Sequence, residues 1–317
     1  MTETHAALKH PPLPAPVLVA SLPEALVVEV HGEDAASWLQ GQLTQDIMPL
    51  ARGEATSAYA LMLTLTGTVL TDLWVHCDAG RWSLTLPRCQ WPALQAHAER
   101  FIIMEDVALE ARADRVLYAC AGPQAAAWVS EITSDGVQAR PTQRLDEAGF
   151  DLWVQDAAHS AFAASLSDTL ARVGGQGPDD ELWEWLRVRR SIPRFGVDFG
   201  TEERPQEASL KCRTLSFTKG CYQGQEAVAM LEHRGKLKRK LFGLRIDSQE
   251  PLPPGAVITG PEDAMLGQLR SSVVDRGQAG VVALASLKRD AFDPTVPLQV
   301  AGCAVLSRWD PERSQAQ

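Results

Sequence analysis

The strongest constraint on the fold is an alternating pattern of apolar and polar residues between residues 57 and 86. Apolar side chains recur at every second position of 59–65, which is the period of a strand with one buried face. Gly67 can turn the chain, and two further strand-like runs follow at 69–75 and 82–86. Three consecutive strands joined by short turns predict an antiparallel meander.

The rest of the chain mixes helical and strand patterns, so we predict an α+β fold with a small C-terminal β-barrel. Helices are expected at 35–43, 91–100, 122–132, 158–172 and 180–190, and further strands at 17–20, 26–30, 107–110, 115–120 and 149–155. Beyond residue 241, short strands separated by Pro and Gly indicate the barrel or a small sandwich. The predicted organisation is an α+β region at 17–235 with two interleaved lobes split near residue 112, a barrel domain at 236–308, and tails at 1–16 and 309–317.

The acidic composition argues against broad nucleic-acid binding. The formal net charge is −10, whereas a nucleic-acid surface needs a basic face that displaces phosphate counterions. No run approaches the ~20 apolar residues of a membrane span, and the N-terminus lacks the charged and apolar segments of a signal peptide. We therefore expect a cytoplasmic protein without a nucleic-acid or membrane partner.

The six cysteines are Cys77, Cys89, Cys120, Cys212, Cys221 and Cys303. They form no C-x-x-C pair and no histidine cluster accompanies them, so we predict no metal site, and a cytosolic chain favours no disulfides. Cys77, Cys120 and Cys303 lie in apolar runs and are expected in the core. Cys212 lies between two basic residues, a setting that favours a thiolate, so it is a candidate to cooperate with Cys221.

The most informative stretch for function is Thr218 to Glu226, which packs a thiol, a cation, two glycines and a carboxylate into nine residues. The pattern at 215–217 indicates the end of a strand, and the apolar residues from Ala227 to Leu231, Met230 among them, indicate the buried side of a helix. Cys221 would then lie in a strand-to-helix turn beside Lys219. Positive charge and the free amides of a helix start both stabilise a thiolate, whereas a lone cysteine is otherwise a small buried apolar residue.

The run Lys-Gly-Cys-Tyr-x-Gly-Gln-Glu at 219–226 resembles the signature of the YgfZ family, which are folate-binding relatives of the glycine-cleavage T-protein, an aminomethyltransferase. Three other runs resemble the family in the same order, at 38–46, 192–198 and 205–207. The resemblance covers about residues 17 to 305. It implies a T-protein-like fold of three lobes around a central cleft, a tetrahydrofolate-type ligand, and a role in assembling or maintaining iron–sulfur proteins.

The resemblance also implies site residues. Cys221 would be the reactive thiol, with Lys219 favouring its thiolate. The predicted folate-binding residues are Glu207, Tyr222, Gln225, Glu226, Asp72 and Arg234. A carboxylate such as Glu207 suits the pterin edge because it can accept two parallel N–H bonds. Asp72 could contact the ligand or simply face outward from its strand.

A basic run from Arg234 to Lys240 follows the motif. It is either a solvated turn or a dock for an anionic group, such as the glutamates of a folate, or for an acidic partner.

Two departures from the related patterns weaken parts of this reading. The T-protein has two adjacent aspartates where this chain has Thr71 and Asp72, and YgfZ relatives usually have an arginine where this chain has Met230. The loss of one carboxylate argues against aminomethyl transfer. We therefore predict a tetrahydrofolate-binding accessory protein for iron–sulfur client proteins, with a folate-dependent one-carbon transferase or a non-catalytic folate-sensing scaffold as alternatives, and leave enzymatic turnover open.

Overall fold

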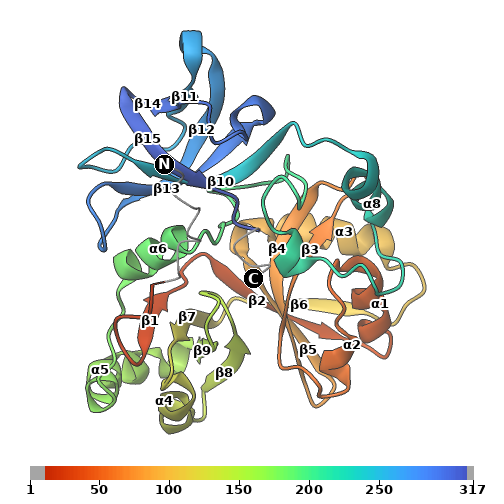
Figure 1. Ribbon diagram of the computed structural model, residues 1–317. Helices are drawn as coiled ribbons and strands as arrows, with labels where there is room; N and C mark the ends of the chain where they lie inside the picture. Colours follow the sequence, from red (N-terminus) through yellow and green to blue (C-terminus); the bar gives the residue numbers. More distant parts are fainter. Residues whose placement is uncertain (1–10, 313–317) are drawn as a thin grey trace. The chain divides into compact units, whose positions relative to one another are not determined.

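The structure, a computed structural model, describes residues 11–312 of the chain, which form two compact units (Figure 1). The sheet unit comprises Leu13–Trp183 and Arg213–Ala227, and the barrel unit comprises, among the described residues, 11–12, Glu184–Cys212 and 228–312. The outer parts of both predicted tails lie outside the described residues. Within 11–312, no helix is both long and apolar enough to cross a membrane.

The sheet unit contains a five-stranded antiparallel sheet in the order β3-β4-β5-β2-β6. Its strands are β2 (Ala25–His31), β3 (Ala58–Leu63), β4 (Val69–Asp78), β5 (Arg81–Pro87) and β6 (Ala108–Arg112). The helices of this region are α1 (Ala35–Gln42), α2 (Met48–Ala51), α3 (Trp91–Phe101) and the short η1 (Arg88–Gln90). Alternate residues of β2, such as Val28 and Val30, share one apolar core with Trp38 of α1 and Leu94 of α3. Strands β3, β4 and β5 pair in sequence and antiparallel, which confirms the predicted meander.

A second, four-stranded sheet has the order β1-β7-β9-β8. Its strands are β1 (Leu18–Ser21), β7 (Arg115–Ala121), β8 (Val137–Thr142) and β9 (Gly149–Gln155), and α4 (Ala125–Ile132) and α5 (Asp156–Arg172) pack on it through a core around Trp128 and Phe162. Strand β1 joins this sheet at its edge by antiparallel pairing with β7. Val27, Leu117 and Trp153 form a smaller apolar cluster from strands of both sheets.

The barrel unit contains a closed barrel in the order β10-β13-β12-β11-β14-β15. Its strands are β10 (Arg239–Ile246), β11 (Val257–Thr259), β12 (Met265–Val274), β13 (Val281–Lys288), β14 (Gln299–Val300) and β15 (Cys303–Trp309), with short turns of helix at η2 (Pro261–Asp263) and η3 (Arg289–Ala291). The Trp309 ring packs on Gly243, where a Cβ would come within 2.1 Å of it. The predicted α+β fold with a small C-terminal barrel is confirmed.

Three helices flank the motif segments: α6 (Asp180–Arg189), α7 (Lys211–Thr214) and α8 (Gln225–Arg234). Two predictions here are wrong. Residues 215–217 form no strand, because the Ser216 amide bonds to the Thr44 carbonyl in a single contact rather than a ladder. Met230 is 60% exposed instead of buried, and Val228 is the residue of α8 that is fully buried.

The irregular segment between α6 and α7 is tied down by a buried ion-pair network in the barrel unit. Arg187 of α6 lies 2.5 Å from the carboxylate of Asp198 and 2.6 Å from that of Glu184. Ser271 of β12 donates to the other Asp198 oxygen at 2.6 Å and accepts from Arg187 at 2.8 Å. Asp198 therefore holds the run at 192–198 against α6 and β12.

Candidate functional site

The loop that carries Cys221 is fixed to the sheet unit by its backbone and by one amide side chain. The Gln223 amide donates to the Gly41 carbonyl at 3.0 Å, and the Gln223 side chain donates to the Leu63 carbonyl at 2.8 Å. Gly224 has φ +80°, and a Cβ there would lie 2.7 Å from the Thr64 carbonyl oxygen. Only glycine fits this close approach, so the loop depends on Gly224 to reach the turn between β3 and β4.

Lys219 makes three of the hydrogen bonds that hold this loop in place. Its buried ammonium donates to three backbone carbonyls, those of Gln40 and Leu43 at 2.6 Å each and that of Gln45 at 3.0 Å. Because burial disfavours the charged form, the pKa of Lys219 is lowered to about 8. An ammonium has three N–H donors, so these carbonyls occupy all of them. A direct role of Lys219 toward the thiol stays a prediction, whereas the structure gives it a positioning role.

The fastened loop exposes Cys221 to solvent. Glu226 is also exposed and Gln225 is half-buried, whereas Tyr222 is 6% exposed, with its ring 5.3 Å from the Lys219 ammonium. Burial raises the pKa of Tyr222 to about 12. The structure thus separates an accessible thiol and carboxylate from a tyrosine that packs beneath them. Folate contacts by Tyr222, Gln225 and Glu226 stay predictions.

All six cysteines are free thiols. Cys120 is buried, as predicted, and burial raises its pKa to about 12, while Cys77 and Cys303 are only partly buried. Cys212 is exposed, but burial of its thiol and the negative charge of Glu312 raise its pKa against the opposing effect of Lys211 and Lys240. The basic neighbours seen in the sequence are thus outweighed.

Asp72 of β4 lies in an enclosed polar cluster of the sheet unit. The Tyr59 hydroxyl donates to its Oδ2 at 2.7 Å, and its Oδ1 is buried without a partner among residues 11–312. Burial raises the pKa of Asp72, although the Tyr59 bond and the Arg144 charge oppose the shift. Arg144 itself forms two bonds to buried Asp151, at 2.6 and 2.7 Å. A carboxyl with a raised pKa and one unpaired oxygen is suited to exchange a proton or accept a donor from a ligand.

Glu207 belongs to the barrel unit, where its carboxylate already has local partners. Its Oε2 accepts from the Arg204 amide at 3.0 Å, and its Oε1 lies 3.8 Å from Arg239. Its side chain is 12% exposed. Arg234, at the end of α8, is exposed. Pterin recognition by Glu207 and ligand binding by Arg234 stay predictions.

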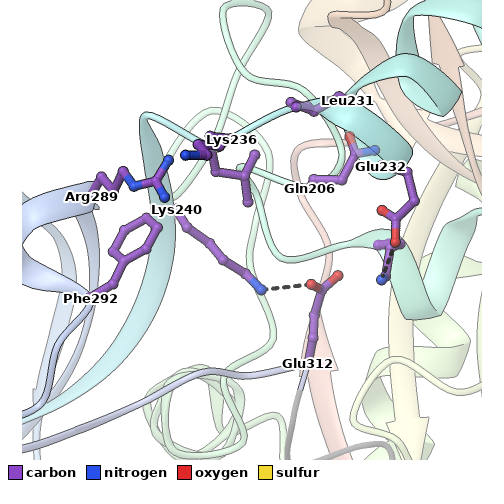
Figure 2. Close-up of a pocket in the computed structure, with 11 residues that line it drawn as sticks. Gln206, Leu231, Glu232, Lys236, Lys240, Arg289, Phe292 and Glu312 are labelled. Atoms are coloured by element: carbon purple, nitrogen blue, oxygen red, sulfur yellow. Dashed lines mark hydrogen bonds and ion pairs between the residues drawn. The ribbon is translucent and has the colours of Figure 1, made fainter.

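A pocket of about 370 Å³ opens in the barrel unit beside Glu207's neighbour Gln206 (Figure 2). The pocket has four basic residues, Lys211, Lys236, Lys240 and Arg289, and two acidic ones, Glu232 and Glu312. The Lys240 ammonium donates to Glu312 at 2.8 Å, and a dashed line marks this contact in Figure 2. The basic run after the motif thus contributes Lys236 and Lys240 to a pocket rather than only to a solvated turn, while Arg234 is not among its lining residues.

Two features of these regions were not visible in the sequence. Gln206 and Glu312 both line this pocket, and the Oε1 atom of each is buried without a hydrogen-bond partner among the described residues. Glutamines on a helix surface are usually solvated, yet here Gln40 bonds to Asp46 at 2.9 Å and Gln42 to His97 at 2.9 Å. Only the repeated amides at 40, 42 and 45 could have indicated such a network.

Comparison with known proteins finds relatives of this chain by sequence and a neighbour by fold. No protein-family model matches it. The tRNA-modifying protein YgfZ of Sodalis glossinidius is 27% identical over 254 residues, which is 77% of this chain and 77% of that protein. The human mitochondrial iron–sulfur cluster assembly factor IBA57 is 28% identical over 289 residues, which is 83% of this chain and 76% of that protein.

The fold comparison gives a crystal structure of aminomethyltransferase T, of the glycine cleavage system, from Bartonella henselae. The TM-score is 0.78, and the match covers 94% of this chain and 86% of that one at 20% sequence identity. The two chains therefore share a fold, although their sequences have diverged.

Proposed function

We propose that this chain, which is similar to YgfZ proteins and IBA57 and shares the aminomethyltransferase fold, is a YgfZ-family protein that binds folate and supports iron–sulfur proteins through Cys221. The observation that carries the proposal is the exposed thiol on a fastened loop. Lys219 and Gln223 tie the loop to carbonyls at 40–45 and at Leu63. A thiol held in this way can meet a partner without a loop rearrangement.

The single thiol sets the form of the mechanism. Iron–sulfur clusters generally take four thiolate ligands, so Cys221 would contact a cluster, or a thiol of the client, only in a transient complex in which the client supplies the other ligands. The Cys221 sulfur would make this contact, and Lys219 would hold the Cys221 loop in position. The folate would bind with Glu207 on the pterin edge and with the basic pocket around Lys236 and Arg289 as one place for an anionic tail.

The names of the relatives combine tRNA modification with cluster assembly. We extend the proposal to iron–sulfur enzymes that act on tRNA as one class of client. A net charge of −10 fits a role through such a client better than direct contact with tRNA.

The test compares two exposed cysteines in a bacterial host that lacks its own YgfZ protein. Wild-type protein and Cys212→Ser should restore the activity of a [4Fe–4S] dehydratase in cell extracts, whereas Cys221→Ser should leave it near the level of the empty vector. Matching melting temperatures would show that both variants fold. Full restoration by Cys221→Ser would contradict the proposed thiol role and favour a scaffold.

Folate binding is tested separately by calorimetric titration of the purified protein with tetrahydrofolate. We expect saturable one-to-one binding that Glu207→Ala loses, and no effect of Cys221→Ser. Absence of heat and of thermal stabilisation with wild-type protein would remove folate from the proposal.

A one-carbon transferase is a second candidate because of one observation, the enclosed carboxyl of Asp72 with its raised pKa. Transfer from a folate nitrogen needs an acid–base group of this kind. Turnover of a methylated or aminomethylated donor that Asp72→Asn abolishes would favour this candidate. Rescue of the dehydratase by Asp72→Asn, without such turnover in wild-type protein, would exclude it.

A further inference from the structure

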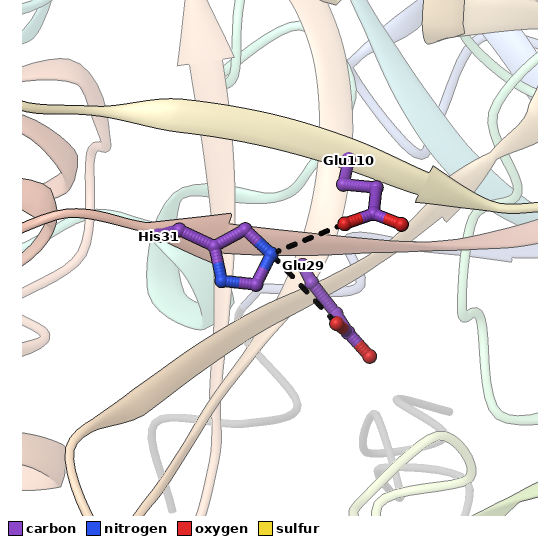
Figure 3. Close-up of side chains that lie close together, drawn as sticks. All are labelled: Glu29, His31 and Glu110. Atoms are coloured by element: carbon purple, nitrogen blue, oxygen red, sulfur yellow. Dashed lines mark ion pairs between the residues drawn. The ribbon is translucent and has the colours of Figure 1, made fainter.

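The five-stranded sheet brings three potential metal ligands together at an exposed edge position. Glu29 and His31 lie two residues apart on β2, so their side chains share one face, and Glu110 of β6 pairs directly opposite Glu29 (Figure 3). One ligand atom from each of the three residues lies within 4.8 Å of the others. These residues have no part in the function proposed above.

The distances match the spacing of ligands around a small ion. His31 Nε2 lies 3.5 Å from Glu110 Oε2 and 3.8 Å from Glu29 Oε2. A tetrahedral Zn²⁺ with bonds of about 2.0–2.2 Å holds neighbouring ligand atoms roughly 3.3–3.6 Å apart. The two carboxylate oxygens lie within 4.8 Å of each other, so small side-chain rotations would bring the histidine and both carboxylates onto one ion.

The surroundings favour a cation at this position. Two like charges directly opposite each other on paired strands destabilise a sheet, and Glu29 and Glu110 are such a pair. Arg112 donates to Glu29 Oε1 at 2.9 Å and leaves Oε2, the oxygen that faces His31, available. Asp114 takes the other two guanidinium bonds of Arg112. Arg112 thus orients Glu29 as an outer-shell group orients a metal ligand.

We propose that Glu29, His31 and Glu110 bind one divalent transition-metal ion of the zinc type. Imidazole nitrogen combined with carboxylate oxygen suits Zn²⁺, Co²⁺ and Cu²⁺ better than Mg²⁺ or Ca²⁺, which prefer oxygen ligands alone. His31 is 52% exposed and Glu110 64% exposed at their side chains, so an ion can enter from solution. Three protein ligands leave a coordination position open to water or to a ligand from another molecule. Cysteine spacing could not indicate this site, because strand pairing and not a sequence motif assembles it.

The test titrates the chelator-treated full-length protein with Zn²⁺ by calorimetry and with Co²⁺ by visible absorption. We expect one ion per chain and a Co²⁺ spectrum without the sulfur-to-metal charge-transfer bands that mark a thiolate ligand. His31→Ala and Glu110→Gln should each weaken binding by roughly tenfold or more. All of these positions are on the surface, so circular dichroism should show that the variants keep the fold.

The matched control is His233→Ala, which removes another exposed histidine, in α8, and should leave the affinity unchanged. Affinity should also be lower in acid, because protons compete with the metal for the ligand atoms. Equal affinity of wild-type protein and His31→Ala would overturn the proposal and place any bound ion elsewhere, on the exposed cysteines if the charge-transfer bands appear. Absence of Zn²⁺ and Co²⁺ binding to wild-type protein would also overturn the proposal.

Discussion

Lys219 in the sheet unit and Arg187 in the barrel unit are both buried cations, yet the protein compensates their charges in opposite ways. Lys219 has only neutral partners, three backbone carbonyls, and burial lowers its pKa to about 8. Burial also disfavours the charge on Arg187, but the carboxylates of Asp198 and Glu184 outweigh it and raise the Arg187 pKa. The first arrangement fastens a loop to a backbone, whereas the second locks side chains to one another.

The difference bears on how each region can be used. The bonds from Lys219 end on backbone carbonyls, so they do not depend on the side chains of residues 40–45. Substitution of the exposed side chains around Cys221 should therefore leave these bonds in place. A network of charges inside a protein depends on every member, because removing one leaves another buried charge unpaired. The three predictions below separate these two modes.

The largest effect is expected for Arg187→Met, which leaves the buried carboxylate of Asp198 without its cation. Breaking a buried pair from one side typically costs about 3–5 kcal/mol, and we expect a loss of that size in the free energy of unfolding. Urea denaturation of wild type and variant measures it. The double variant Arg187→Met, Asp198→Leu should recover part of the loss, and failure to recover would show that Arg187 acts mainly through packing.

Acid should affect the two units in different pH windows. In the sheet unit, burial lowers the pKa of His76 and of His97 from 6.5 to about 4. The unfolded chain then binds more protons than the folded one between pH 6.5 and 4, so stability falls as pH drops through this window. For His76, whose ring nitrogens are buried without partners among residues 11–312, the full shift corresponds to about 3 kcal/mol.

In the barrel unit, Glu184 is the informative group. Burial opposes its ionisation, but Arg187 outweighs this and keeps its pKa below 4.5. Its contribution is therefore present above pH 4.5 and is lost only below that value. Hydrogen exchange at pH 7, 5 and 4 should show the sheet unit losing protection first, and His76→Leu should reduce that early loss. Simultaneous loss in both units at pH 5, in wild type and variant alike, would contradict the assignment.

The sequence predicted the elements whose patterns are local. The strand alternation at 59–86 and the short Pro- and Gly-separated strands after 241 indicated the meander and the barrel. Strand β8 was missed because Arg140 and Pro141 interrupt its alternation. The site could be predicted only as far as the motif and the family resemblance reach. That Lys219 would reach back to Gln45, 174 residues away, or that Glu110 would face Glu29, depends on long-range pairing that no local pattern encodes.

The smallest effect, and the most informative for function, is expected for Lys219→Met. The variant keeps the length of the side chain but leaves three carbonyls without their donor, and unsatisfied buried groups cost about 1–3 kcal/mol. Because burial already penalises the Lys219 charge, part of this cost is offset, and we expect a loss of about 2 kcal/mol, less than for Arg187→Met. Loosening of the loop should appear as faster amide exchange at 216–224 with little change in β10–β15.

Lys219→Arg is the matched control for charge, since it keeps a cation but cannot place one ammonium among three converging carbonyls. If Lys219 acts by positioning, both variants should reduce the Cys221-dependent rescue of a [4Fe–4S] dehydratase to a similar degree. If Lys219 instead acts on the thiol by its charge, Lys219→Arg should keep the wild-type alkylation rate of Cys221, measured at one fixed pH, whereas Lys219→Met should lower it. The two variants thus distinguish a Lys219 that stabilises the thiolate by its charge from a Lys219 that holds the loop in position.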